Sequence, residues 1–384
     1  MKVIPYGRQC ITDEDIEAVA EALRSDYLTQ GPRIAEFERK FADYVGAPEG
    51  VAVSNATAGL HIACKALGVK PGQRVICTPI TFAASANCAR YCGADVTFCD
   101  IDPKTFLIDY DKLEAILSSH PSGTFAGVIA VDFAGYPLDM PRLREIADRH
   151  GLWIIEDACH APGAWREDAA GVKQHAGNAR FADCTVFSFH PVKHIATGEG
   201  GMVTAARPEV IEGLRLYRSH GITKDPARLE KNDGGWYYEM QDLGFNYRIT
   251  DIQAALGISQ LKRADAGLAR RQEIAGRYDR ELAGIPGLVT PFRESGLLHA
   301  FHLYVIRTPR RKELYDFLHD RGILAQVHYV PLHLMPYYRE QGCRPGDCPE
   351  AEAYYSECLS LPMFPTLTDE DQTRVIETVK EFFK

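Results

Sequence analysis

The 384-residue sequence contains no apolar run long enough to span a lipid bilayer. Residues 1–8 also lack the apolar segment of a secretory signal peptide. Basic residues are in the minority, because 43 Lys and Arg face 52 Asp and Glu, for a formal net charge of −9. This charge disfavours nucleic acid and anionic membranes as partners, but it allows a local basic pocket for an anionic substrate. We therefore expect a cytoplasmic protein with neither partner.

The 11 cysteines include no Cys-x-x-Cys pair, are odd in number and lie mostly in apolar runs. This usage is typical of free thiols in a reducing compartment. A zinc site could be assembled from His328, His333, Cys343 and Cys348, but their spacings match no zinc pattern. We expect no bound metal.

Residues 51–205 alternate between short apolar runs and segments of helical period, without internal repeats. Continuous apolar strands between helices predict an α/β fold with a mostly parallel, doubly wound sheet covered on both faces. The expected strands are 51–53, 74–77, 95–99, 127–131, 153–156, 185–189 and 201–205. The expected helices in and before this region are 12–23, 34–44, 57–67, 82–92 and 140–150.

The pattern changes at about residue 256, and a chain of this length predicts two domains. A long charged helix over 257–282 leads into shorter segments at 301–306 and 325–330 and a closing helix over 369–383. We therefore predict a large domain over 1–255, with an N-terminal arm, and a connecting helix with a small α+β domain over 256–384.

Lys193 and Asp157 each follow an apolar strand, and parallel α/β sheets bind ligands beyond their strand ends. Lys193 also precedes a glycine-rich turn at 198–201. Pyridoxal 5′-phosphate (PLP) requires an amine for Schiff-base formation and an acid beside its ring nitrogen, which these residues could supply. A solvated surface lysine is the alternative for Lys193 alone. The neighbouring Glu156 is the alternative acid, and strand alternation sends it and Asp157 in opposite directions.

A phosphate site requires backbone N–H groups at a helix N-terminus together with hydroxyl groups. Residues 54–60 open a helix with small side chains, including Ala56 and Thr57, and Ser188 adds a hydroxyl near Lys193. Phe82 could stack on a cofactor ring, or it could be a core aromatic residue.

These segments together resemble the DegT-type sugar-nucleotide aminotransferases, which have the aspartate aminotransferase fold (fold type I) and use PLP. The resemblance covers nearly the whole chain in the right order. Its segments are 29–31, 54–58, 78–82, 156–160, 188–193, 199–201 and 244–251.

The resemblance implies roles for individual cofactor-binding residues. Lys193 would bind the cofactor covalently and move the proton between the amino donor and the cofactor. Asp157 would hold the ring nitrogen, and His160 would take the place, often Gln, that hydrogen-bonds the phenolic oxygen. Further implied contacts are Ala56, Thr57 and Ser188 on the phosphate, Phe82 on the ring, and Asn246 on the phosphate in the neighbouring subunit of a homodimer with shared sites.

Residues 322–329 and Tyr6 further resemble the branch of this family that acts in pseudaminic acid biosynthesis. That branch uses glutamate to aminate the 4-keto group of UDP-2-acetamido-2,6-dideoxy-β-L-arabino-hexos-4-ulose. The implied substrate contacts are Tyr6, Asp26, Tyr27, Leu28, Thr29, Ala325, Gln326, Val327 and His328. From periodicity alone, residues 326–329 could equally be a strand of alternating exposure.

His194 follows the lysine, and some family members that dehydrate their substrate have histidine in place of lysine. Ser188 and Glu199 fix the motif register from both sides, so lysine stays at 193 and we predict a transaminase. Two alternatives remain open from the sequence: an aminotransferase for another UDP- or dTDP-linked keto sugar, and a PLP-binding regulator without turnover.

Overall fold

The fold is that of a computed structural model, which describes residues 2–384. Its centre is a sheet in the strand order β2-β10-β9-β6-β5-β3-β4, in which β10 runs antiparallel to both neighbours and the other pairs are parallel. The strands are β2 (Glu49–Val53), β3 (Arg74–Cys77), β4 (Asp95–Phe98), β5 (Phe125–Val131), β6 (Trp153–Asp157), β9 (Cys184–Ser188) and β10 (Gly201–Ala205). All seven predicted strands are therefore confirmed to within about two residues at each end.

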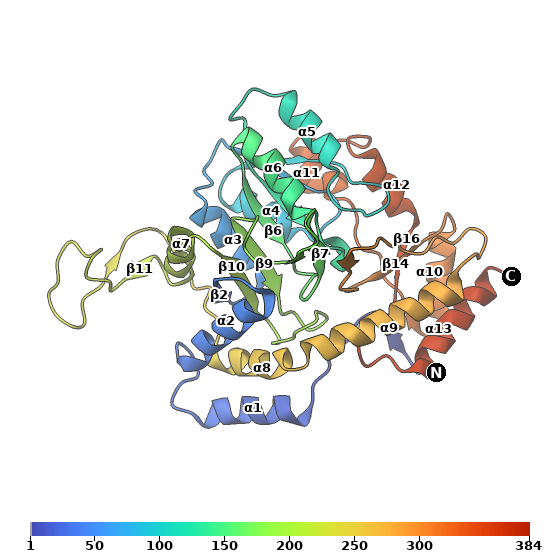
Figure 1. The fold of residues 1–384 in the computed structure, drawn as a ribbon, viewed down its shortest axis with the longest axis horizontal. Coiled ribbons are helices and arrows are strands. Elements are labelled where there is room, and N and C mark those ends of the chain that lie inside the picture. Colours follow the sequence, from blue (N-terminus) through green and yellow to red (C-terminus); the bar gives the residue numbers. More distant parts are fainter. Residues whose placement is uncertain (1) are drawn as a thin grey trace.

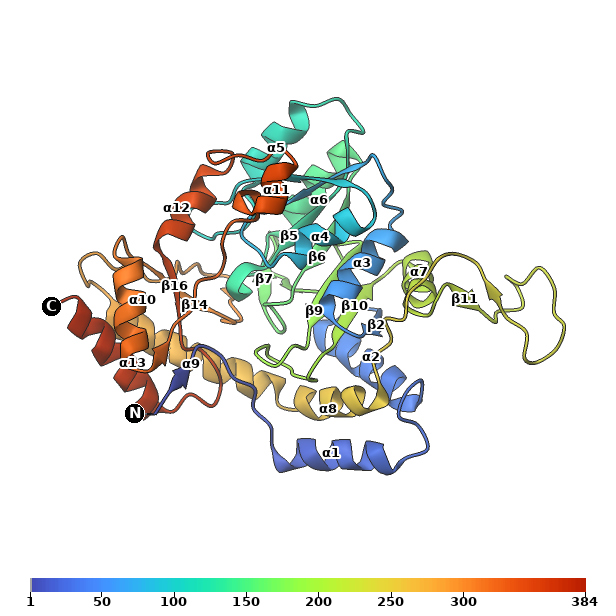
Figure 2. The same cartoon turned by 180° about the vertical axis from the view of Figure 1, so that it is seen from behind.

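Helices cover both faces of this sheet (Figures 1 and 2). One face carries α3 (Ala56–Ala66), α4 (Ala84–Tyr91) and α7 (Pro208–Arg218). The other face carries α2 (Pro32–Val45), α5 (Tyr110–Ser118), α6 (Met140–His150) and α8 (Asp251–Leu261). Each face of the sheet has its own hydrophobic core, and successive residues of a strand point into opposite cores. In β3, for example, Val75 packs in the core beneath α3, α4 and α7, and Ile76 packs in the core beneath α5 and α6.

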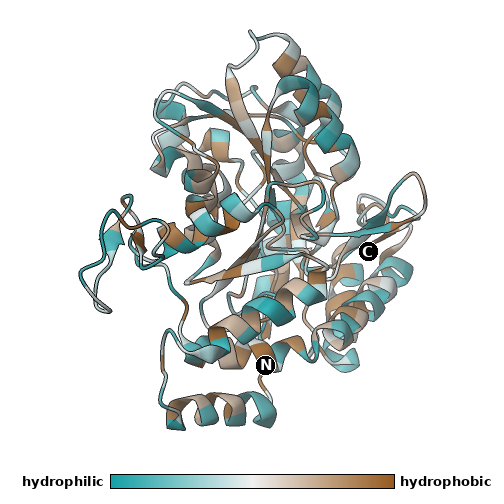
Figure 3. Ribbon diagram, turned by 60° about the vertical axis from the view of Figure 1, so that its left-hand side comes forward, coloured by the Kyte–Doolittle hydropathy of each residue, from teal (hydrophilic) through white to brown (hydrophobic). Residues whose placement is uncertain are grey.

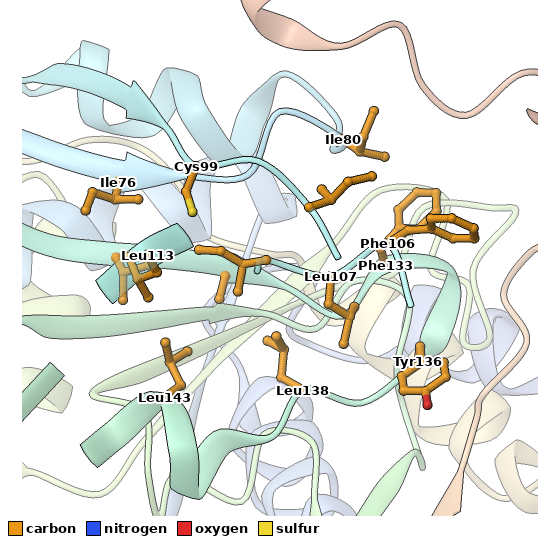
Figure 4. Close-up of a cluster of buried hydrophobic side chains, with 14 of the residues drawn as sticks. Ile76, Ile80, Cys99, Phe106, Leu107, Leu113, Phe133, Tyr136, Leu138 and Leu143 are labelled. Carbon is orange, nitrogen blue, oxygen red and sulfur yellow. The ribbon is translucent and has the colours of Figure 1, made fainter. Parts of the chain in front are cut away.

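The core on the α5–α6 side is built from apolar side chains of several elements (Figure 4). Leu113 of α5, Leu143 of α6 and Ile76 of β3 all belong to this core, and all three side chains are fully buried. The 3-10 turn η1 (Phe133–Gly135) extends the same core toward the strand ends and adds Phe133. This packing holds the carboxyl edge of the sheet, where the candidate site residues lie.

The C-terminal part forms a separate layer of small sheets and helices around a third core. Around this core lie α9 (Ala264–Leu282), β14 (Tyr304–Arg307), α10 (Arg311–Asp320), β15 (Ile323–Leu324), β16 (Cys358–Leu361) and α13 (Asp369–Phe382). The remaining C-terminal elements pack on the large domain instead: η2 (Leu332–Leu334) and α11 (Pro336–Glu340) join the core on the α3–α4 face, and α12 (Pro349–Glu357) joins the core on the α5–α6 face. The N-terminal strand β1 (Ile4–Pro5) pairs in parallel with β15, so residues 4–5 join this layer rather than the large sheet.

Two expectations for the C-terminal half are wrong. The single helix over 257–282 is instead two helices, α8 and α9, because the chain leaves helical geometry at Arg263. The strand over 325–330 is absent: β15 ends at Leu324, and beyond it only Gln326 makes an isolated bridge, to Ser360. The alternation of apolar residues over 325–330 therefore reflects burial of side chains in a loop, and not the hydrogen-bond pattern of a β-sheet.

Two peripheral segments project from this body (Figure 1). The helix α1 (Asp13–Arg24) begins at Thr12, whose backbone N–H donates to Asp15 Oδ2 (3.0 Å), and it packs on α8. Hydrophilic and hydrophobic residues alternate along it (Figure 3). The second segment is the hairpin of β11 (Ile222–Thr223) and β12 (Glu239–Met240).

The small strands β7 (Trp165–Glu167), β8 (Lys173–His175) and β13 (Leu297–Leu298) form one further sheet.

Across residues 2–384, no helix is both long enough and apolar enough to cross a membrane. The same residues contain no group of three His, Cys, Asp or Glu side chains arranged to hold a metal ion. His333 of the candidate zinc set instead pairs with Glu352 (2.9 Å). All 11 cysteines are free thiols.

Candidate active site

A cavity of about 650 Å³ opens beyond the carboxyl ends of β6 and β9. Asp157 is the last residue of β6 and Ser188 the last of β9, so their side chains reach the cavity directly from the sheet. Nine of the predicted residues line it: Tyr6, Ala56, Thr57, Phe82, Asp157, His160, Ser188, Lys193 and His328.

Asp157 is held in place by a chain of two hydroxyl groups, one from α4 and one from the loop before that helix. Ser85 Oγ donates to Asp157 Oδ2 at 2.6 Å, and Thr81 Oγ1 lies 2.7 Å from Ser85 Oγ. Since the Ser85 proton is directed at the carboxylate, the Thr81 hydroxyl is the donor to Ser85. The backbone N–H of Cys159 donates to the other oxygen, Oδ1 (3.2 Å). The carboxylate is therefore oriented before any ligand arrives.

Glu156 points to the other face of the sheet, as strand alternation predicts. Its Oε2 accepts hydrogen bonds from Thr185 Oγ1 (2.7 Å) and the Gly177 N–H (3.1 Å), and it does not line the cavity. Burial raises the pKa of Glu156. Asp157 is thus the acid that the fold presents to a ligand.

Lys193 enters the cavity from the loop after β9. Its backbone N–H donates to the His190 carbonyl (2.9 Å), which closes a turn and fixes the base of the side chain. Burial lowers the pKa of Lys193 to about 8, because the charged ammonium loses hydration. About a tenth of the amine is therefore neutral, and so nucleophilic, at pH 7, far more than for an exposed lysine.

His160 lies on the turn that follows β6. Its Nδ1 accepts the backbone N–H of Ala134 (3.2 Å), so the ring proton belongs on Nε2, which lies 3.3 Å from the Tyr329 hydroxyl. Burial and the nearby Lys193 charge lower the pKa of His160 well below its usual value. A neutral imidazole with an Nε2–H is suited to donating a hydrogen bond to a ligand oxygen.

The start of α3 forms a cradle for an anion. Asn55 caps this helix by accepting the Ala58 N–H on Oδ1 (2.8 Å), while the N–H groups of Ala56 and Thr57 have no acceptor within residues 2–384. Gly201 of β10 lies so close that an added Cβ would sit 2.8 Å from the Ala56 nitrogen. The cradle thus combines free donors and the positive end of a helix dipole.

Phe82 is not a core residue, so that alternative is wrong. Its side chain is 62% exposed, lines the cavity and lies 6.4 Å from the Tyr329 ring, centroid to centroid. The reason is that α4 begins at Ala84, two residues later than expected, which leaves Phe82 on the preceding loop. An exposed ring at a cavity wall is suited to stacking on a planar ligand.

The remaining predicted residues do not line the cavity formed by this chain. Tyr27 and Leu28 lie about half exposed on the segment after α1, and Asn246 is exposed on the segment before α8. Ala325 is buried, with its carbonyl 2.8 Å from His319 Nε2. The others of this group are Asp26, Thr29, Gln326 and Val327.

The cavity residues that were not assigned a role from the sequence include Ser85, His302 and Tyr329. Ser85 could have been found, because it lies four residues after Thr81, a spacing that places two hydroxyls on one side of a helix start. His302 and Tyr329 carry no such local signal, since their partners Lys193 and His160 are 109 and 169 residues away.

Comparison with known proteins decides the family. Residues 9–380 match the DegT/DnrJ/EryC1/StrS aminotransferase family. The chain belongs to this family. It is 40% identical to the spore coat polysaccharide biosynthesis protein SpsC of Bacillus subtilis, over 99% of this chain and 97% of that protein. It is 36% identical to a UDP-4-amino-4,6-dideoxy-N-acetyl-beta-L-altrosamine transaminase of Campylobacter jejuni, over 98% of this chain and 96% of that protein.

Solved structures agree with this membership. Helicobacter pylori PseC, an aminotransferase involved in pseudaminic acid biosynthesis, superimposes with a TM-score of 0.90 at 31% identity, covering 100% of this chain and 99% of that one. The putative sugar aminotransferase Spr1654 of Streptococcus pneumoniae, in its pyridoxamine phosphate form, gives a TM-score of 0.90 at 31% identity, covering 99% of each chain. The resemblance drawn from the sequence is confirmed, and with it fold type I, sugar aminotransferase activity and PLP as the cofactor.

The cavity residues fit this cofactor. The oriented carboxylate of Asp157, the low-pKa amine of Lys193 and the free N–H groups of the α3 cradle match a pyridinium nitrogen, an aldehyde and a phosphate. When bound, PLP acts as an electron sink that makes the α-proton of an amino acid acidic. Within this chain, Lys193 Nζ would take and return that proton, and Asp157 would hold the ring nitrogen of the cofactor in its protonated form.

Proposed function

We propose that this aminotransferase moves the amino group of L-glutamate to the C4 ketone of a nucleotide-linked 6-deoxy sugar. The most specific candidate is UDP-2-acetamido-2,6-dideoxy-β-L-arabino-hexos-4-ulose, which would yield the UDP-4-amino sugar of pseudaminic acid biosynthesis. The similarity to the Campylobacter transaminase and to PseC over the full chain supports this choice.

The observation that carries the proposal is the part of the cavity wall where Tyr6 and His328 meet. Their rings lie 5.1 Å apart between centroids, and both line the cavity. Ser360 Oγ lies 2.9 Å from His328 Nδ1, so the imidazole is fixed and its Nε2 is left for a ligand. Burial lowers the pKa of His328 to about 3. This neutral polar wall suits the hydroxyl and acetamido groups of a sugar.

The proposed reaction has two halves, which use one site in turn. Lys193 would move a proton for glutamate in the first half and for the sugar in the second. 2-Oxoglutarate would leave before the keto sugar enters, so initial rates should follow ping-pong kinetics. A requirement for both substrates to bind together would contradict this scheme.

The similarity to SpsC, which at 40% exceeds that to the Campylobacter transaminase, favours a second candidate, an aminotransferase for another keto sugar. The deciding experiment supplies the purified enzyme with glutamate and either the β-L-arabino 4-keto sugar or its α-D-xylo C5 epimer. Preference for the L-configured sugar, measured as kcat/KM, supports the pseudaminic acid role. Preference for the D-configured sugar assigns the second candidate instead.

We also infer that the enzyme works as a homodimer with shared sites. The β11–β12 hairpin projects from the body (Figure 1). It exposes apolar side chains that one copy leaves uncovered. These are Trp236 (75% exposed), Tyr238 (54%), Met240 (64%) and Leu243 (67%). Exposed apolar patches of this kind are typical of interfaces. The hairpin leads into Asn246, which would then reach the phosphate of the second subunit's cofactor.

A further inference from the structure

His302 faces the reactive amine of Lys193 from the C-terminal layer. Its Nε2 lies 3.4 Å from Lys193 Nζ, a long hydrogen bond, and both residues line the cavity. Catalytic hydrogen bonds are often long before a substrate binds. Among residues 2–384, His302 is the one side chain that lies within hydrogen-bond distance of Lys193 Nζ with suitable geometry.

The ring of His302 is held by its surroundings and has little freedom to turn away. The side chain is only 4% exposed, and it packs on His160 with ring centroids 4.3 Å apart. Its other nitrogen, Nδ1, is buried without a hydrogen-bond partner in the described chain. Native proteins keep few such unpaired groups, and a catalytic role is one of the reasons for keeping them.

The backbone around His302 is anchored from two sides. On one side, the N–H of Ala300 donates to the Gly135 carbonyl (2.7 Å) and that of Leu303 to the Ala134 carbonyl (3.2 Å). On the other side, Arg271 Nη1 donates to the carbonyls of Phe301 (2.9 Å) and His302 (3.4 Å). Phe301 adopts a left-handed φ of 47°, so the segment is held in a conformation that needs such support.

Arg271 is an unusual anchor, because it is 1% exposed and bonds only carbonyl oxygens, including that of Met363 (3.0 Å). A buried cation without a carboxylate would be a poor choice for packing alone. Arg271 fixes the segment before β14, which carries His302. Its positive charge also lowers the pKa of Lys193, in addition to the effect of burial.

We propose that His302 is a positioning residue for Lys193: its neutral Nε2 accepts the hydrogen bond of the lysine amine and keeps Nζ directed into the cavity whenever that amine is free. The amine is free in the protein without cofactor and again after the amino donor has displaced it. In both states a flexible four-carbon side chain would otherwise sample other rotamers. The role depends on the aminotransferase chemistry of the family and not on the identity of the sugar.

The test measures the amine itself in protein freed of cofactor. Competitive acetylation with acetic anhydride across pH 6–11, followed by mass spectrometry of the Lys193 peptide, gives the midpoint and the rate of labelling. The titratable groups that face this amine are Asp157, Cys159, His160, His194, Arg271, His302 and His328. Only His302 is changed, so the other six contribute equally in every sample.

His302→Phe keeps a ring of similar size but removes the acceptor. We expect its labelling midpoint to fall below that of wild type, because the ammonium loses the partner that stabilises it. His302→Gln keeps an acceptor at comparable reach and should retain a midpoint near wild type. The first half-reaction with glutamate should slow about tenfold in the Phe variant and less than about threefold in the Gln variant, as expected for one hydrogen bond.

His299→Phe is the matched control, since His299 is buried on the same segment and accepts the Phe301 N–H (2.9 Å) but does not line the cavity. It should leave the Lys193 midpoint unchanged. Thermal melting identifies any variant that fails to fold. If His302→Phe fails, the labelling midpoint and the half-reaction rate of His302→Gln are compared with those of wild type. An unchanged midpoint in His302→Phe, or a Gln variant as slow as the Phe variant, would overturn the proposal.

Discussion

Ser85 donates its hydroxyl proton to Oδ2 of Asp157 over 2.6 Å and thereby connects α4 to the end of β6. Both side chains are buried, so water cannot replace the contact without rearrangement. The bond fixes the plane of the carboxylate that would face the cofactor nitrogen. We therefore expect Ser85 to support cofactor binding, although it belongs to no motif recognised in the sequence.

Replacing Ser85 with alanine should weaken PLP binding about ten- to a hundredfold, because a hydrogen bond to a charged group contributes about 1.5–3 kcal/mol. The dissociation constant is measured by adding PLP to cofactor-free protein and following the visible absorbance. Thr204→Val is the control, since it removes another buried hydroxyl, bonded to the Gly177 carbonyl (2.8 Å), far from the cavity. Equal affinities in Ser85→Ala and wild type would show that Asp157 needs no such support.

Lys193→Met should stabilise the cofactor-free protein by roughly 3 kcal/mol at pH 7, while abolishing transamination. Burial lowers the Lys193 pKa from 10.5 to about 8 in the folded state, so the unfolded chain binds more protons between these values. The free-energy cost of burying the charged ammonium is therefore fully present below about pH 8, and it disappears as the pH rises through 10.5. Urea unfolding at pH 7 and pH 10 measures it, with exposed Lys70→Met as the control. A difference between Lys193→Met and wild type that did not shrink with pH would contradict this account.

Arg271→Met should lower the free energy of unfolding by about 4 kcal/mol. The change removes one buried cation but leaves the carbonyls of Phe301, His302 and Met363 without donors, and each orphaned acceptor costs about 1–3 kcal/mol. Arg280→Met, on the exposed side of the same helix, should change stability by less than about 0.5 kcal/mol. Similar urea midpoints for the two variants would mean that the buried carbonyls find other donors.

Shared sites predict that two inactive variants can complement each other. Lys193→Ala and Asn246→Ala should each lose most activity alone. Their co-expressed mixture should regain about a quarter of wild-type activity, because half the dimers are mixed and each mixed dimer has one intact site. Affinity tags on both variants isolate the mixed dimer for assay. No recovery in the isolated mixed dimer would place Asn246 and Lys193 in sites built from a single subunit.

Much of the site was accessible from the sequence, because strand ends and helix starts are local features. The alternation that separates Asp157 from Glu156 depends only on the period of a β-strand. Ala56, Thr57 and Ser188 follow from a helix N-terminus and a strand end in the same way. These residues lie within a few positions of an element boundary that hydrophobic periodicity reveals.

The sequence was less informative wherever the outcome depends on packing between distant segments. The break between α8 and α9 and the loop over 325–330 were both mistaken for regular structure, since periodicity reports burial and not hydrogen bonding. Phe82 could be assigned to neither core nor cavity until the start of α4 was known.

The amino-acid sequence by itself determined the alternating α/β architecture, the lysine and the acid at the strand ends, and the family to which they belong, because each is written in residues close along the chain. Only the tertiary structure decided which partners hold them. Lys193 and His302 are separated by 109 positions, and Asp157 and Ser85 by 72. Such contacts exist because the sheet, the α9 helix and the C-terminal layer pack around one cavity, and no local pattern records that packing.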